Sequence, residues 1–249
     1  MRRSFAAGTL FATAHGTPPW RVLALPGWMH QAGDFDAALA PLGAGGLAVD
    51  LPGFGGPTPP PPAVWGAADY AAWLEALLDE DAMDERLVVV GHSFGGRVAV
   101  NLAARRPDRV KALVLAGVPL LRRRDRPKAK PAAAFRAARW LHRRRLLPDE
   151  RMESMRQRYG SHDYRNARGV MRDVLVTVTN ETYEQQLLST TCDVALVWGA
   201  LDGAVPPAVA EQAAALLGER ASLTVLDGVG HQVPLEAPDA LRAAIERRL

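Results

Sequence analysis

The clearest indication of chemistry in this sequence is a serine set among glycines. The run Gly91-His92-Ser93-Phe94-Gly95-Gly96 follows the apolar stretch 87–90 and precedes the helical pattern of 97–104. A buried strand, a Gly-x-Ser-x-Gly turn and a helix in this order predict a nucleophile elbow, which exposes the serine hydroxyl at the strand tip. The turn is so tight that a side chain at the flanking glycines would collide with the neighbouring backbone. Ser93 is therefore the candidate nucleophile, beside the free N–H groups of a helix N-terminus.

A serine nucleophile needs a base, and the base needs an acid that orients it. In a parallel sheet all three groups must lie at the carboxyl edge of the strands. His231 follows the predicted strand 222–226 through a glycine-rich loop, and Asp202 follows the predicted strand 194–198. His92 lies inside the elbow, so its side chain is expected to point elsewhere. The chain order serine, aspartate, histidine differs from two other common serine-triad orders.

Apolar runs and helical patterns alternate along most of the chain. This alternation predicts an α/β fold with a mostly parallel central sheet and helices on both faces. A leading hairpin is expected over residues 4–14, and Asp34 is expected to cap a helix that runs from Phe35 through Leu42. The predicted strands are 20–25, 47–49, 87–90, 112–116, 194–198 and 222–226, and the other predicted helices are 67–78, 97–104, 209–217 and a last helix from Asp239.

The alternation is interrupted once, over residues 119–190, where helical periodicity replaces the strand pattern. We therefore predict a core formed by residues 1–118 and 191–249, with residues 119–190 inserted as helices between two strands of one sheet. Residues 118–158 hold 14 Lys or Arg against 4 Asp or Glu, a local net charge of +10 in a chain whose net charge is +3. One buried helical face is predicted from the spacing of Val170, Met171, Val174, Leu175 and Val178.

The composition indicates one folded domain. A chain of 249 residues with 48% hydrophobic content can build a single large α/β core. The lone cysteine, Cys192, excludes an internal disulfide framework and favours a reducing, cytoplasmic location. No uncharged apolar run reaches the ~18 residues of a membrane span. We expect no metal ion and no cofactor, and no nucleic-acid partner because the basic run Arg122–Lys130 lacks interleaved aromatic residues.

Five motifs resemble those of the α/β-hydrolase superfamily, over nearly everything except the helical insertion. The resemblance implies that the insertion is a cap over the pocket and that the backbone N–H groups of Trp28 and Phe94 form an oxyanion hole. The chain departs from the family at Pro26-Gly27, where His-Gly is usual, so a contact behind the Trp28 loop is missing. Among subfamilies it resembles the carboxylesterases typified by the pimeloyl carrier-protein methyl ester esterase, which also begin this loop with Gly-Trp. The motifs are Pro26-Gly27-Trp28, Asp50-Leu51-Pro52-Gly53-Phe54-Gly55, the elbow run, Trp198-Gly199-Ala200-Leu201-Asp202 and Gly230-His231-Gln232-Val233-Pro234-Leu235-Glu236-Ala237-Pro238.

The resemblance and the three candidate side chains predict a serine hydrolase that cleaves a carboxylic ester or thioester through an acyl-enzyme on Ser93. A serine at the elbow argues against the haloalkane dehalogenase and epoxide hydrolase branches, which use an aspartate there. Two alternatives stay open: hydrolysis of a C–C bond next to a ketone with the same residues, and a non-catalytic binding module. The basic insertion favours anionic substrates, such as a coenzyme A thioester or an acyl group on an acidic carrier protein, and a solvated surface is the competing interpretation.

Overall fold

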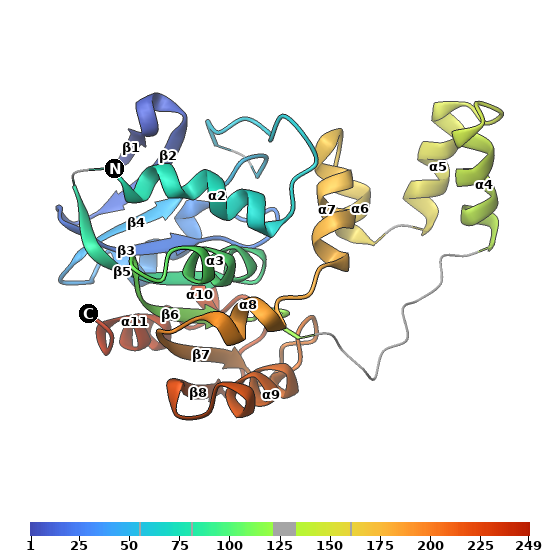
Figure 1. The fold of residues 1–249 in the computed structure, drawn as a ribbon. Coiled ribbons are helices and arrows are strands. Elements are labelled where there is room, and N and C mark those ends of the chain that lie inside the picture. The colour runs from blue at the N-terminus through green and yellow to red at the C-terminus, as the bar shows by residue number, and fades with distance from the viewer. Residues whose placement is uncertain (55, 81, 122–132, 160) are drawn as a thin grey trace.

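The computed structural model of the protein contains one eight-stranded sheet with helices on both faces (Figure 1). The structure describes residues 1–54, 56–80, 82–121, 133–159 and 161–249, so the basic run Arg122–Lys130 lies outside the described residues. Across the sheet the strand order is β1-β2-β4-β3-β5-β6-β7-β8. The strands are β1 Arg2–Phe5, β2 Leu10–His15, β3 Trp20–Leu25, β4 Gly45–Val49, β5 Met83–His92, β6 Val110–Ala116, β7 Asp193–Gly199 and β8 Ala221–Leu226.

The sheet is parallel everywhere except at its β1 edge. Strands β4, β3, β5, β6, β7 and β8 pair in parallel in that order, whereas β1 pairs antiparallel with β2, and β2 with β4. The prediction of a mostly parallel sheet is therefore confirmed. Because the parallel strands share one direction, β5, β7 and β8 all end at the same edge of the sheet.

Alternation of side chains along the strands gives the sheet two apolar faces. In β5 and β7, for example, Val89 and Leu196 belong to one hydrophobic cluster, while Val90 and Val197 belong to the other. Near-continuous apolar runs predict burial on both faces of the sheet, because successive side chains of a strand point to opposite faces. Both faces must therefore be covered by helices.

Two groups of helices cover these faces. The face that holds Val89 packs against α2 (Ala67–Leu78), α3 (Phe94–Arg105), α8 (Glu184–Ser189) and α9 (Pro207–Leu217). The opposite face packs against α1 (Asp36–Leu39), α10 (Val233–Glu236) and α11 (Pro238–Glu246). In the part of the chain that the structure describes, three short 3₁₀ turns, Ala6–Gly8, Ala32–Phe35 and Gly218–Arg220, lie between other elements.

The helix expected over residues 35–42 is shorter than predicted. A 3₁₀ turn covers Ala32–Phe35 and α1 ends at Leu39. Asp34 lies within the 3₁₀ turn and caps neither element, because its carboxylate Oδ2 binds His30 Nδ1 at 2.5 Å. The imidazole four residues earlier competes with the backbone for this short acidic side chain, as is common for Asp near turns.

Between β6 and β7 the described residues form helices joined by loops and turns, and none of them belongs to a strand. This helical block comprises α4 (Ala133–Arg143), α5 (Asp149–Tyr159), α6 (His162–Asn166), α7 (Val170–Asn180) and α8. On α7 four of the five residues of the predicted face, Met171, Val174, Leu175 and Val178, are buried, and Val170 at the start of the helix is only partly buried. Figure 1 shows α4 and α5 farthest from the sheet, with α6 and α7 between them and the core. Among the described residues, no helix combines the length and apolar character needed to cross a membrane.

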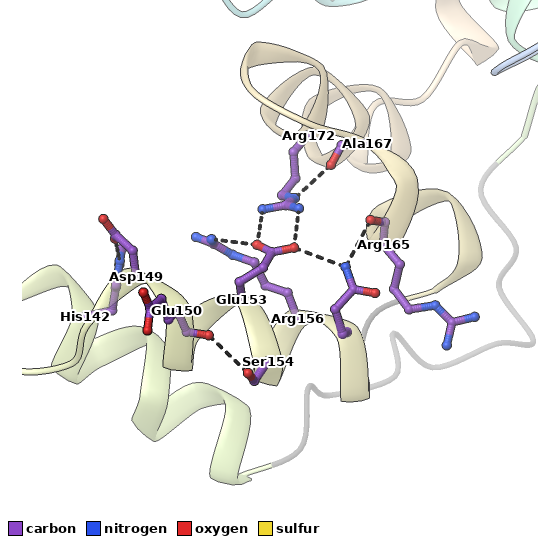
Figure 2. A network of polar contacts seen from close by, with 10 residues as sticks. His142, Asp149, Glu150, Glu153, Ser154, Arg156, Arg165, Ala167 and Arg172 are labelled. Atoms are coloured by element: carbon purple, nitrogen blue, oxygen red, sulfur yellow. Dashed lines mark hydrogen bonds and ion pairs between the residues drawn. The ribbon is translucent and has the colours of Figure 1, made fainter.

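One carboxylate joins the outlying helices to α7 (Figure 2). Glu153 of α5 accepts two parallel hydrogen bonds from the Arg172 guanidinium, each 2.9 Å long, and a third from Arg156 at 3.2 Å. Bidentate pairs of this kind are the stronger class of ionic hydrogen bonds. The bonds from Arg172 lower the pKa of the Glu153 carboxyl to about 2.

We expect Glu153→Gln to weaken the attachment of α5 to α7. A carboxylate whose pKa is lowered on folding stabilises the fold fully above its ordinary pKa of 4.5, and that stabilisation is lost as the pH falls toward about 2. The pair is partly exposed, so the variant should lose about 1 kcal/mol or less at pH 6. Urea unfolding of both proteins at pH 6 and pH 3 measures this difference, which should shrink at pH 3. Glu150→Gln, on the same helix, is the control, and an equal loss there would contradict the assignment.

Candidate active site

Ser93 lies at a strained turn between β5 and α3. Its backbone has φ 48° and ψ −110°, a left-handed conformation that side chains rarely adopt, and its N–H donates to the Ala116 carbonyl at 2.9 Å. A Cβ on Gly91 would overlap the backbone of Gly96, and a Cβ on Gly95 would overlap the backbone carbonyl of Leu25. The glycines therefore allow the close approach that holds the serine in this strained turn.

Ser93, His231 and Asp202 form one chain of hydrogen bonds. His231 Nε2 lies 3.1 Å from Ser93 Oγ, and His231 Nδ1 lies 2.8 Å from Asp202 Oδ2. An ionised carboxylate only accepts, so His231 carries its proton on Nδ1 and presents the Nε2 lone pair to the serine hydroxyl. This arrangement prepares Nε2 to accept the serine proton.

The Asp202 carboxylate is held on both of its oxygens. While Oδ2 faces His231, Oδ1 accepts the backbone N–H groups of Ala204 at 2.9 Å and Val205 at 2.8 Å. Only 3% of the residue is exposed. Trp198 closes the same loop, because its indole N–H donates to the Val205 carbonyl at 2.8 Å. The acid is thus fixed in one orientation.

Backbone contacts tie the loops of the acid and the base together. The N–H groups of Ala200 and Leu201 donate to the carbonyls of Leu226 and Val229, both at 2.9 Å. Behind the pair lies Gly117, just past the end of β6, where a Cβ would come within 3.0 Å of the His231 ring. The carboxyl ends of β6, β7 and β8 therefore meet around the imidazole.

The two backbone groups expected to form an oxyanion hole lie at the start of α3 and on the loop after β3. Phe94 is the first residue of α3, so its N–H has no partner one turn earlier in the helix. Trp28 follows β3, and no described residue accepts a hydrogen bond from its backbone N–H. Their side chains pack edge to face with ring centroids 5.6 Å apart, and Trp28 also packs on Phe54 at 4.8 Å. The aromatic rings of Trp28, Phe54 and Phe94 therefore lie beside both backbone donors.

A methionine of the helical block lies close to these aromatic residues. Met171 of α7 lies against Gly53, where a Cβ would overlap its side chain, and its Sδ lies 3.9 Å from the Tyr70 hydroxyl. The same hydroxyl donates to the Pro52 carbonyl at 3.0 Å, and burial raises the pKa of Tyr70. Helix α7 thus packs beside the loop that carries Phe54, next to the candidate site.

Two histidines near the site were not predicted to contribute. His92 points away from Ser93, as expected, yet its Nε2 lies 2.9 Å from the backbone carbonyl of His231. His30, paired with Asp34, packs edge to face on His92 with ring centroids 5.6 Å apart. One feature of the sequence could have indicated them, since His92 lies within the elbow run and His30 lies two residues after the Pro26-Gly27-Trp28 motif.

The fold and the family comparison are those of a hydrolase family. The chain belongs to the alpha/beta hydrolase family, whose model matches residues 15–244. It is 36% identical over 136 residues to epoxide hydrolase 2 of Siraitia grosvenorii, covering 54% of this chain and 39% of that protein. It is 42% identical over 84 residues to the pimeloyl-[acyl-carrier protein] methyl ester esterase of Aromatoleum aromaticum, covering 32% of this chain and 30% of that protein. The chain thus matches well under half the length of these relatives.

Solved structures extend the similarity of fold to the whole chain. An esterase from Thermogutta terrifontis superposes with a TM-score of 0.68 at 21% identity, covering 99% of this chain and 97% of that one. At this identity the likeness speaks for the fold alone. The family resemblance and the α/β-hydrolase fold are confirmed. Among the described residues, no cluster of three or more His, Cys, Asp or Glu side chains could hold a metal ion.

Proposed function

We propose that the protein is a serine hydrolase that cleaves a carboxylic ester or thioester. The observation that carries this proposal is the unbroken hydrogen-bond chain from Asp202 through His231 to Ser93. Such a chain can raise the nucleophilicity of a serine, which is weak when its proton has no acceptor. An aspartate nucleophile, expected of the epoxide hydrolase branch, is missing from the elbow.

The reaction divides into two acyl transfers. Ser93 Oγ attacks the acyl carbon while His231 Nε2 takes its proton, and the resulting imidazolium then protonates the departing alcohol or thiol. Water enters next, gives a proton to His231 and displaces Ser93, which recovers its proton as the acid leaves. Asp202 holds the imidazole and stabilises its positive charge throughout. The N–H groups of Phe94 and Trp28 are proposed to bind the oxyanion that forms in each half.

The helical block of residues 119–190 is proposed to act as a cap that selects the substrate. The contact of Met171 with the loop beside the site supports this role, as does the excess of positive charge in the block. On α4 the exposed residues Arg136, Arg139 and Arg143 line one hollow together with Trp140. Two carboxylates of α5 are already paired, Asp149 with His142 and Glu153 with Arg172. An excess of positive charge attracts anions, so an anionic or carrier-linked acyl group is the proposed substrate.

We expect anionic esters and thioesters to be hydrolysed with a kcat/KM that falls as salt rises, because salt shortens electrostatic attraction to ~10 Å near 0.1 M. A panel that pairs neutral with anionic substrates of equal acyl length tests this. Changing Arg136, Arg139 and Arg143 together to Gln should lower kcat/KM for the anionic members about tenfold and leave the neutral members within about twofold.

The control makes the same charge change at and just beyond the far end of α3, by converting Arg105, Arg106 and Arg109 to Gln. Helix α3 begins at the site and has 12 residues, so its far end lies about 18 Å away along its axis. Equal effects of the two triple variants would show that only net charge matters. Absence of turnover for every ester and thioester would contradict the proposed function itself.

A further inference from the structure

His92 occupies a position between two loops of the candidate site. Only 2% of the residue is exposed, although it directly precedes Ser93. Its Nε2 lies 2.9 Å from the His231 backbone carbonyl oxygen. A carbonyl can only accept a hydrogen bond, so His92 Nε2 carries the hydrogen and donates it. His92, the residue before the candidate nucleophile Ser93, thereby holds the backbone of His231, the candidate base.

The other side of the His92 ring faces the loop that follows β3. A Cβ built on Gly27 would lie 2.9 Å from His92 Nδ1, so this loop rests directly on the imidazole. The ring of His30, from the same loop, packs edge to face on His92, and Asp34 Oδ2 holds His30 Nδ1 at 2.5 Å. The loop that carries Trp28 and the loop that carries His231 therefore meet on opposite sides of one side chain.

This side chain remains neutral while the base beside it changes charge. Burial above all, together with the nearby His231, lowers the pKa of His92 to about 3. The other titratable groups that face His92 are His30 and Asp202, whose charges act on it in opposite directions. Above about pH 4 the ring therefore keeps one hydrogen, and the bond to the carbonyl fixes that hydrogen on Nε2.

We propose that His92 is a positioning residue for the hydrolysis: its Nε2–H bond to the His231 carbonyl, with Gly27 packed on its opposite side, sets the base relative to the oxyanion loop. The inference rests on the proposed function. It adds a residue that acts through His231 and never touches the substrate. Displacing a catalytic group by about 1 Å can cost on the order of 10²-fold in rate.

A matched pair of variants isolates this bond. The amide nitrogen of Gln can reach the position of Nε2, whereas that of Asn corresponds to Nδ1 and falls short of the carbonyl. We therefore expect His92→Gln to keep kcat within about fivefold of wild type, and His92→Asn to lose about 10- to 100-fold in kcat with little change in KM. Thermal unfolding of both variants shows the folded fraction to which each rate is referred. Equal rates for the two variants would overturn the proposal.

A second measurement separates positioning of His231 from a general structural role. In the His231→Ala background, His92→Asn should cost less than about twofold, because a residue that acts through His231 has nothing left to position. A further loss as large as in wild type would show that His92 works by another route. Ser93→Ala, assayed in parallel, distinguishes this failure from failure of the proposed function, since turnover that survives Ser93→Ala contradicts the nucleophile and not the His92 bond.

Discussion

Replacing Ser93 with alanine is expected to lower the turnover of an activated ester by about 10⁶-fold, and replacing His231 with alanine to cost nearly as much. The hydroxyl and the imidazole act as one unit, joined by a hydrogen bond of 3.1 Å. Loss of either leaves no nucleophile that can be deprotonated as it attacks. The rate that remains comes from oxyanion binding and substrate binding alone.

Covalent labelling tests the reactivity of Ser93 without the need to choose a substrate. A fluorophosphonate probe should react with wild type at Ser93, with loss of fluoride, and the modified peptide can be identified by mass spectrometry. Ser154→Ala is the matched control, because this exposed serine of α5 donates only to the Glu150 carbonyl at 3.1 Å. Labelling of Ser93→Ala at the wild-type level would remove Ser93 from the mechanism.

Much of the sheet could be predicted because its strands are apolar on both faces. The runs 20–25 and 67–78 correspond to β3 and α2 residue for residue. Strand β5 was predicted only over 87–90, yet it begins at Met83. The three residues after Met83 are charged, and they are held by contacts across the sheet such as the 3.1 Å ion pair between Asp84 and Arg21. The hydrophobic pattern of a sequence does not indicate such an ion pair.

In the candidate site, too, the sequence pattern predicts which residues come together but not the contacts between distant residues. Ser93, Asp202 and His231 could be selected because each follows a strand of a parallel sheet, and such strands end at one edge. Their catalytic roles, and the oxyanion role of Trp28 and Phe94, stay predictions. The bond from His92 to the His231 carbonyl spans 139 positions in sequence, so only the folded chain reveals it.

The helical block was predictable in type and not in arrangement. Spacing of apolar residues indicated the buried face of α7, because a helix returns the same face every 3.6 residues. The contact between Glu153 and Arg172 joins α5 and α7, and an amphipathic pattern does not specify which charged side chains will pair across two helices. The division into core and cap at residues 119 and 190 likewise stays a prediction.

Asp202→Asn should fold normally and lose about 10⁴-fold in kcat. The structure fixes which atom of the new amide would face His231. Position Oδ1 accepts two backbone N–H groups, from Ala204 and Val205, and only an oxygen can accept them. The amide NH₂ must therefore occupy the Oδ2 position and donate to His231 Nδ1, which forces the imidazole hydrogen onto Nε2. In that tautomer Nε2 has no lone pair for the Ser93 proton.

Asp202→Asn should lower the rate of acylation and leave the stability of the fold unchanged, since the new side chain keeps the volume of the old one and its two hydrogen bonds to the backbone. Single-turnover acylation by an activated ester, together with thermal unfolding, separates these quantities. Asp50→Asn is the matched control: Asp50 is also a buried carboxylate following a strand, but its ion pair is with Arg2 at 3.3 Å. We expect that control to acylate within a few-fold of wild type. If Asp202→Asn acylates as fast as Asp50→Asn, the tautomer of His231 is set by something other than Asp202, and the acid of the proposed triad lies elsewhere.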